Sequence, residues 1–208
     1  MRSKHLFDFV SSIAGLALFS PLFVVIALWI RIDSPGPIFF RQVRVGRYGR
    51  PFKIFKFRTM YADAEARGRK ITVEDDPRIT RTGRFLRKCK FDELPQLFNV
   101  LRGEMSLVGP RPEVRRYVEF YPEEIRRQVL SIRPGITDFA SILYKDESTV
   151  LAGAVDPEVT YVNVILPEKL KHYVRYVSER TLWLDFKIIL LTLVEIVRRG
   201  KSENGIKQ

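Results

Sequence analysis

FVSSIAGLALFSPLFVVIALWI, residues 9–30, is the stretch that decides how this chain folds, because it contains no charged side chain over 22 residues. A helix needs about 20 apolar residues to cross a bilayer, so this run is long enough to enter one. A secretory signal is a poorer match, since its apolar core would be shorter and would end at a small-residue cleavage site. We predict a membrane helix over residues 1–32 and one globular part over residues 33–208.

Ser20 and Pro21 interrupt this run near its middle. Proline removes one helical hydrogen bond and clashes with the preceding turn, so it bends or breaks a helix. Basic residues flank both ends of the run, with Lys4 before it and Arg31 after it, and positive flanks tend to stay in the cytoplasm. If both flanks stay on that side, the helix is re-entrant and turns at Ser20 and Pro21. An ordinary kinked spanning helix is the alternative.

The composition indicates an anionic partner. The chain has 208 residues and a formal net charge of +12, which suits nucleic acid, anionic lipid or a phosphorylated substrate. A single cysteine, Cys89, excludes an internal disulfide and a multi-cysteine zinc site, and we expect its thiol to be inert. The two histidines, His5 and His172, are too far apart in sequence to suggest metal-ligand spacing.

A basic β-hairpin is predicted after the membrane segment. Residues 38–45 and 52–59 are rich in β-branched and aromatic side chains, and the glycines and proline between them supply turn chemistry. Lys56 and Arg58 would lie on one face of the second strand, since side chains alternate along a strand. This pair could hold a phosphate. The alternative is a solvated basic face that lies on lipid headgroups.

Asp92 and Glu93 are adjacent carboxylates that follow a basic helix carrying Arg87. Such acids can hold a metal ion or attack phosphorus, while nearby cations neutralise phosphoryl oxygens. Asp92 is expected to be the N-cap of a helix that runs to Leu101. The alternative is an acidic first turn that only favours the helix dipole.

Arg111 stands between Pro110 and Pro112, just after a short predicted strand over residues 105–109. Prolines on both sides restrict its backbone. A guanidinium held in one orientation suits bidentate phosphate binding.

Two helices are expected near the C-terminus, over residues 168–177 and 182–197. The second is strongly apolar and is followed by basic residues. It is predicted to lie in the membrane interface, with a core helix as the alternative. The fold class is therefore α+β: one helix-rich domain with a small β-hairpin, a re-entrant membrane helix and interfacial amphipathic helices.

Four segments resemble the bacterial initiating sugar transferases, or monotopic phosphoglycosyl transferases. They are KFRTM (56–60), FDELPQLFNVL (91–101), MSLVGPRP (105–112) and RPGIT (133–137). The apolar run with its Ser20-Pro21 break also resembles the re-entrant helix of that family. The likeness covers nearly the whole chain, whose length is similar to the family's minimal catalytic form.

The resemblance implies transfer of a sugar-1-phosphate from a UDP-sugar to a polyprenol phosphate, with Mg²⁺ and release of UMP, as the first membrane step of surface glycan assembly. Asp92 would be the nucleophile that forms an aspartyl-phosphosugar intermediate, and Asp92 and Glu93 would bind the metal. The cations expected to bind substrate phosphates are Lys56, Arg58, Arg87, Arg111 and Arg133.

The same resemblance implies a location at the bacterial inner membrane, with the catalytic part on its cytoplasmic face and in contact with anionic lipid. Nucleic acid is not an expected partner, and a homodimer is left open. The alternative from another class is a non-enzymatic basic membrane adaptor or nucleic-acid-binding protein, which the ordered motifs do not favour.

The chain departs from the family pattern at three places. Lys90 stands where members usually carry a small hydroxyl residue, and DFAS (138–141) replaces a common Gly-Leu-Ala-Gln. Tyr173 stands where many members carry an Asp, so either Asp138 or Asp156 replaces that acid or its role is dispensable.

Overall fold

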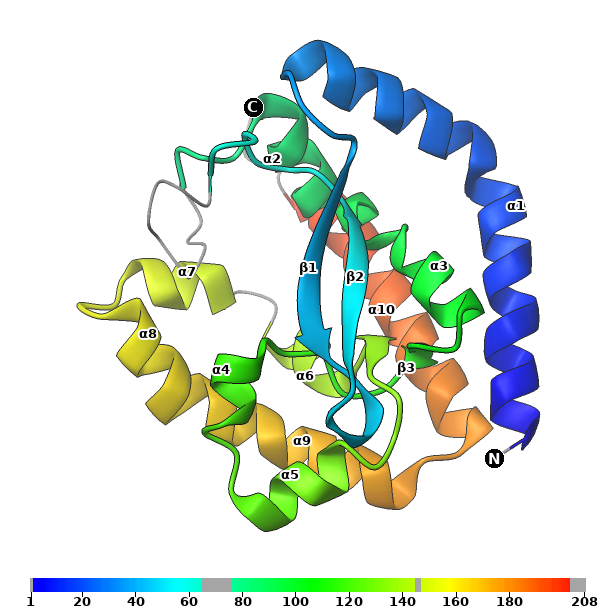
Figure 1. Cartoon of the computed structure of the whole chain (residues 1–208), viewed down its shortest axis with the longest axis vertical. Helices are drawn as coiled ribbons and strands as arrows, with labels where there is room; N and C mark the ends of the chain where they lie inside the picture. The colour runs from blue at the N-terminus through cyan, green and yellow to red at the C-terminus, as the bar shows by residue number, and fades with distance from the viewer. Residues whose placement is uncertain (1, 65–75, 145–146, 203–208) are drawn as a thin grey trace.

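A computed structural model describes residues 2–64, 76–144 and 147–202. The molecule is mainly helical and contains two small two-stranded sheets, as Figure 1 shows. The helices are α1 (Arg2–Asp33), η1 (Arg47–Gly49), α2 (Arg81–Lys88), η2 (Phe91–Glu93), α3 (Gln96–Leu101), α4 (Arg115–Val118), α5 (Glu123–Val129), α6 (Phe139–Leu143), α7 (Glu147–Ala152), α8 (Pro157–Thr160), η3 (Tyr161–Ile165), α9 (Leu166–Glu179) and α10 (Leu182–Ser202). The strands are β1 (Phe39–Val45), β2 (Pro51–Phe57), β3 (Ser106–Val108) and β4 (Gly135–Thr137).

The predicted hairpin is confirmed. β1 and β2 pair antiparallel, from Phe39 opposite Phe57 to Val45 opposite Pro51. The turn between them uses Gly49 at a φ of 76°, a conformation that glycine adopts without steric cost. Phe52 and Ile54 of β2 are buried in a small core with Val100 of α3, so the hairpin is fixed against the segment that follows Asp92 and Glu93.

Helix α1 is one continuous element that contains Pro21. It ascends along one side of the molecule and bends over its top (Figure 1). Within the described chain it is the one helix long and apolar enough to cross a membrane by length and composition. Many of its apolar side chains are exposed, with Leu18 at 74% and Ile32 at 84%, so a large part of its surface finds no cover in the protein.

Both ends of α1 are bound to the globular part. Near its start, the ammonium of Lys4 forms an ion pair with the buried carboxylate of Asp185 on α10 at 2.6 Å. Asp8 accepts hydrogen bonds from the hydroxyl of Ser106 and the backbone N–H of Leu107, both at 3.1 Å. At its other end, the Asp33 carboxylate accepts the backbone N–H of Thr82 at 3.0 Å. Both ends of α1 therefore contact the same globular part of the protein.

The short parallel pair β3–β4 supports the loop that carries Arg111. Ser106 lies opposite Gly135 and Val108 opposite Thr137. Gly109 and Gly135 touch backbone to backbone, and a Cβ added to Gly135 would lie 2.1 Å from the nitrogen of Gly109. The Gly135 N–H then donates to the carbonyl of Pro110 at 2.9 Å, which fixes the chain immediately before Arg111.

The C-terminal helices form the largest core. Tyr161, Leu166, Leu170 and Tyr173 of η3 and α9 pack with residues of α4, α5 and α6. The two predicted C-terminal helices are both present, as α9 and α10. Helix α10 buries Ile188 but exposes Trp183 at 80% and Leu190 at 62%, so it has one face in the protein and one apolar face outside it.

Candidate functional site

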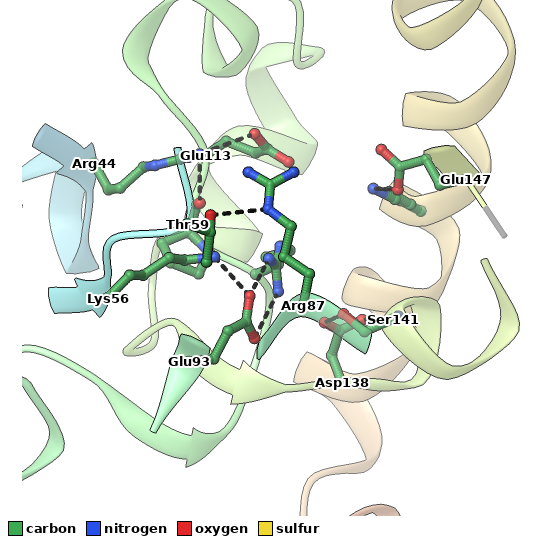
Figure 2. Close-up of polar contacts among 12 residues, drawn as sticks. Arg44, Lys56, Thr59, Arg87, Glu93, Glu113, Asp138, Ser141 and Glu147 are labelled. Atoms are coloured by element: carbon green, nitrogen blue, oxygen red, sulfur yellow. Dashed lines mark hydrogen bonds and ion pairs between the residues drawn. The ribbon is translucent and has the colours of Figure 1, made fainter. Parts of the chain in front are cut away.

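Glu93 is the centre of the candidate site (Figure 2). Its Oε1 accepts hydrogen bonds from the ammonium of Lys56 and from Nη2 of Arg111, both at 2.6 Å, and Oε2 lies 3.4 Å from Nη1 of Arg111. Burial acts to raise the pKa of Glu93, but Arg111 and Lys56 outweigh it and hold that pKa well below its usual range. Glu93 is therefore an ionised anchor for two cations.

Asp92 has a different environment although it is the adjacent residue. Its side chain is buried, and Oδ1 has no hydrogen-bond partner among the described residues. Burial raises its pKa from the ordinary value, with Lys56 acting in the opposite direction and Glu93 adding to the rise. A desolvated carboxylate with a free oxygen is more reactive than one saturated by donors, because fewer hydrogen bonds must be broken before it attacks.

The expected N-cap at Asp92 is wrong. Lys90 is the residue before the 3-10 turn η2, and the α-helix begins only at Gln96. Pro95 follows the turn, and a proline is tolerated only near a helix start. The Asp92 side chain is consequently not used on backbone N–H groups, which agrees with its unpartnered oxygen.

Arg87 lies beside this cluster, at the end of α2. Its Nε donates to the hydroxyl of Thr59 at 2.9 Å, a bond that Figure 2 draws as a dashed line. Burial lowers the pKa of the Arg87 guanidinium, with Asp92 acting in the opposite direction. Lys56, Arg87 and Arg111 thus lie around the two acids, and their role in binding substrate phosphates stays a prediction.

Arg58 is not brought to this cluster. Its guanidinium donates to the carbonyl oxygens of Ser34, at 2.7 Å, and of Pro35. The expectation that it shares a face with Lys56 is wrong because β2 ends at Phe57, and Arg58 turns towards the end of α1. Arg58 therefore satisfies carbonyl groups at a helix C-terminus, where a cation is favoured.

Arg133 also lies away from the cluster. Its Nη1 is 3.0 Å from Nδ1 of His5, near the start of α1, and its guanidinium lies close to Gly103. The backbone of the motif that contains Arg133 supports the site, because Pro134 and Gly135 form hydrogen bonds with Ser106 and Pro110 on either side of β3.

Several polar residues near the site were not predicted. The carboxylate of Glu113, directly after Pro112, accepts the hydroxyl of Tyr161 at 2.6 Å and lies 3.7 Å from Arg44. The buried ammonium of Lys169 forms an ion pair with the half-buried carboxylate of Glu147. The sequence could have indicated Glu113, because this residue directly follows the Pro-Arg-Pro motif. The pairing of Lys169 with Glu147 depends on long-range packing.

Asp138 is the acid that lies near Arg111, and Asp156 is not. Asp138 is buried, and its carboxylate accepts the hydroxyl and the N–H of Ser141 at 2.6 and 2.9 Å. Burial raises its pKa, with Ser141 and then Arg111 acting against that rise. Asp156 instead caps α8, on the exposed side of the molecule. Of the two candidates to replace the family acid at position 173, only Asp138 is close to the site.

A divalent cation would find two carboxylates here. No group of three or more His, Cys, Asp or Glu side chains able to hold a metal occurs in the described ranges. Mg²⁺ commonly uses only one or two protein carboxylates and takes its remaining ligands from water and substrate phosphates. The unpartnered Asp92 oxygen beside Glu93 matches this coordination preference of Mg²⁺.

The sequence matches the family described as "Bacterial sugar transferase" over residues 1–199. It is 38% identical over 196 residues to the UDP-N-acetylgalactosamine-undecaprenyl-phosphate N-acetylgalactosaminephosphotransferase of Aeromonas hydrophila, covering 93% of this chain and 43% of that protein. It is 37% identical over 196 residues to the UDP-glucose:undecaprenyl-phosphate glucose-1-phosphate transferase of Caulobacter vibrioides, covering 93% of this chain and 69% of that protein.

An uncharacterized sugar transferase of Bacillus subtilis is 37% identical over 208 residues, which covers 100% of this chain and 92% of that protein. The chain thus spans less than half the length of the Aeromonas relative and most of the Bacillus one. A basic adaptor or a nucleic-acid-binding protein is not favoured by these likenesses. The match over nearly the whole chain means that this protein belongs to the bacterial sugar transferase family.

Proposed function

We propose that this protein transfers a sugar-1-phosphate from a UDP-sugar to a polyprenol phosphate and releases UMP, as an initiating step of surface glycan assembly. The observation that carries this proposal is the position of Asp92, a buried carboxylate with a free oxygen, beside Glu93, which binds Lys56 and Arg111, with Arg87 close enough for its charge to act on both acids. The relatives are named for undecaprenyl-phosphate acceptors and for UDP-sugars that differ between them. The proposed donor is therefore a UDP-sugar, with no particular sugar assigned.

In the first step, a carboxylate oxygen of Asp92 attacks the phosphorus that bears the sugar. A new bond joins that oxygen to phosphorus, and the bond from phosphorus to the UMP oxygen breaks, so UMP leaves with the electron pair. In the second step, a phosphate oxygen of the acceptor attacks the same phosphorus and Asp92 leaves as a carboxylate. Covalent catalysis splits one displacement into two, so one small site can serve a soluble donor and a membrane-bound acceptor in turn.

The three cations are arranged to neutralise charge on the transferred group. Phosphoryl transfer depends mainly on positioning and on electrostatic stabilisation of the equatorial oxygens. Lys56 and Arg111 are held by Glu93, so they remain oriented before substrate arrives. Arg87 is oriented by Thr59 and has its remaining N–H groups for phosphate. Mg²⁺, held by Asp92 and Glu93 with the donor diphosphate, would supply further neutralising charge.

For the membrane, we propose that α1 is re-entrant and that the globular part lies on the cytoplasmic face of the bacterial inner membrane. A spanning helix places its ends on opposite sides of a hydrocarbon core about 30 Å thick. Here Lys4 binds Asp185 near one end of α1, and Asp33 binds Thr82 at the other. The exposed apolar faces of α1 and α10 meet at Phe7 and Phe186, whose ring centroids are 5.0 Å apart, which supports one continuous lipid-facing surface.

The test of this function is the Asp92→Asn variant, purified in detergent beside the wild type. We expect the wild type to form a covalent protein–sugar-phosphate adduct from a labelled UDP-sugar in the absence of lipid, and to release UMP. The Asn variant should form no adduct and show no turnover. Because relatives differ in their named sugars, a panel of UDP-sugars is needed. Substantial turnover by the Asn variant would exclude Asp92 as the nucleophile.

A further inference from the structure

A cavity of about 320 Å³ lies between α1, α3 and α10 and reaches the ion-pair cluster. Its walls are mostly apolar and include Phe19 of α1, Leu97 of α3, and Ile189 and Leu193 of α10. The charged residues that line it are Lys90, Glu93 and Arg111, at the end near the ion-pair cluster, and Glu195 of α10. The cavity therefore joins an apolar chamber to the cations of the candidate site.

We propose that this cavity binds the end of the acceptor lipid nearest its phosphate, and that Lys90, with Arg111, binds that phosphate. The first isoprene units would lie against α1 and α10, and the rest of the chain would remain in the bilayer. This proposal rests on the proposed function, because it assigns the acceptor's place in the same site. It adds a residue, Lys90, that the two-step chemistry above does not use.

Lys90 carries the charge that suits this role. Its side chain is exposed, and its ammonium forms no ion pair or hydrogen bond within the described ranges. It lowers the pKa of both Asp92 and Glu93, so it lies close enough for its charge to act on the dyad. Its backbone has a φ of 58°, which is uncommon for a residue other than glycine. Such a conformation at a reactive site points to a functional constraint.

The charge of the cavity favours a phosphate monoester over a phosphodiester phospholipid. Its volume of about 320 Å³, within the roughly 300–1,000 Å³ range of small-molecule pockets, has room for the first isoprene units. A phosphate monoester carries about −1.5 to −2 charge at neutral pH, whereas a phosphodiester carries one. Lys90, whose ammonium has no partner in the described ranges, adds its charge to that of Arg111, which Glu93 pairs, and this surplus cation favours the more highly charged headgroup.

Two variants test the two ends of the cavity. Lys90→Gly removes the ammonium but keeps the backbone relaxed, because glycine adopts positive φ without strain. Leu193→Trp fills the apolar chamber from α10. The matched controls are Lys53→Ala, an exposed lysine on β2, and Leu190→Trp, an exposed leucine of α10 that does not line the cavity.

Each variant is assayed separately for the two half-reactions at about pH 8. Adduct formation from UDP-sugar without lipid should stay within about twofold of the wild type in all four variants. Discharge of the adduct to polyprenol phosphate should show a KM raised by roughly tenfold or more in Lys90→Gly and Leu193→Trp, and little change in the controls. If both test variants discharge their adducts as the controls do, the cavity is not the acceptor site.

The outcomes separate this inference from the proposed function. Failure of the wild type to form an adduct would overturn the function itself, whereas a normal adduct with normal discharge in Lys90→Gly and Leu193→Trp would overturn only the acceptor site. A polyprenyl phosphate with a diazirine on its first isoprene unit should label peptides of α1 and α10. Excess unlabelled polyprenyl phosphate should remove the labelling. Equal competition by phosphatidylglycerol vesicles would show a general lipid groove and would also overturn the proposal.

Discussion

The hydroxyl of Ser20 donates a hydrogen bond to the carbonyl oxygen of Ala17 at 2.8 Å. In a regular helix this carbonyl would accept the backbone N–H of residue 21, but residue 21 is proline and has none. The serine thus replaces the hydrogen bond that proline removes. In hydrocarbon an unsatisfied carbonyl is costly because no water reaches it, so the pair Ser20-Pro21 lets α1 bend without leaving a bare acceptor.

We predict that replacing both Ser20 and Pro21 by Ala straightens α1 into a helix that spans the bilayer. Alanine restores the missing N–H and has the highest helix propensity. The N-terminus would then move to the far side of the membrane, against the preference of its basic residues. The measurement is labelling of an introduced N-terminal Cys, in a Cys89→Ser background, with an impermeant reagent on intact cells.

The wild-type N-terminus should be protected in that experiment, and the double variant should gain at least partial labelling. The control is the same introduced Cys labelled after permeabilisation, which should react in both proteins. Labelling of the wild type from outside would mean that α1 is an ordinary spanning helix and that the contact of Lys4 with Asp185 does not form in the membrane.

A second prediction concerns the cations around Glu93. Lys56→Ala and Arg111→Ala should each lower kcat/KM for the UDP-sugar by roughly ten- to hundredfold, since a hydrogen bond to a charged group is typically worth about 1.5–3 kcal/mol. Arg50→Ala, at an exposed position in the hairpin turn, should have little effect. Similar losses at all three positions would mean that the basic residues act only as a diffuse membrane anchor.

A third prediction follows from the raised pKa of Asp92. Only the ionised carboxylate is a nucleophile, so the rate of adduct formation should fall with decreasing pH around a midpoint above about 3.9, the ordinary Asp value. Lys56 favours the ionised form, so Lys56→Met should move this midpoint to higher pH. The pH profile of single-turnover adduct formation measures both, with Arg50→Ala as the control. A midpoint that falls or stays unchanged in Lys56→Met would contradict the assignment.

The raised pKa of Asp92 also predicts how the stability of the protein changes with pH. A carboxyl whose pKa is higher in the folded state favours folding below its unfolded pKa, and loses that contribution as pH rises through the folded pKa. At neutral pH the buried Asp92 therefore destabilises the protein, and Asp92→Asn should raise Tm. The gain should shrink as the pH falls through the raised folded pKa and should be lost below about 4, where Asp92 is protonated in both states. Thermal unfolding of both proteins across pH checks this, and a lower Tm for the Asn variant at neutral pH would refute it.

Patterns local in sequence predicted much of this molecule. Runs of β-branched and aromatic residues with turn residues between them located the hairpin, the apolar run located α1, and the segment from Asp92 to Pro112 located the acids and Arg111. Each of these features depends on neighbours within a few turns of the chain. The N-cap at Asp92 failed because Lys90 adopts a left-handed conformation and starts a 3-10 turn, which propensity alone does not reveal.

Side-chain positions that depend on tertiary contacts did not follow from the sequence. Arg133 belongs to a motif of the site, yet its guanidinium lies beside His5, which is 128 residues away in sequence. Arg58 lies two residues after Lys56, but Lys56 binds Glu93 and Arg58 binds the end of α1. Charge and spacing identified a group of cations. Which acceptor each cation reaches is decided by packing.

The contrast between Arg58 and its predicted role yields a last prediction. Its guanidinium is buried and donates to the carbonyls of Ser34 and Pro35, which otherwise have no helical partner. Arg58→Ala should therefore destabilise the protein by about 1.5–3 kcal/mol and expose the chain around residues 34–37 to protease. Below the unfolding temperature, KM for the UDP-sugar should stay within about twofold of the wild type. Lys56→Ala is the matched control, expected to weaken catalysis with a smaller loss of stability. If Arg58→Ala instead raises KM strongly and leaves Tm unchanged, the guanidinium moves to the substrate during turnover and the sequence-based assignment is correct after all.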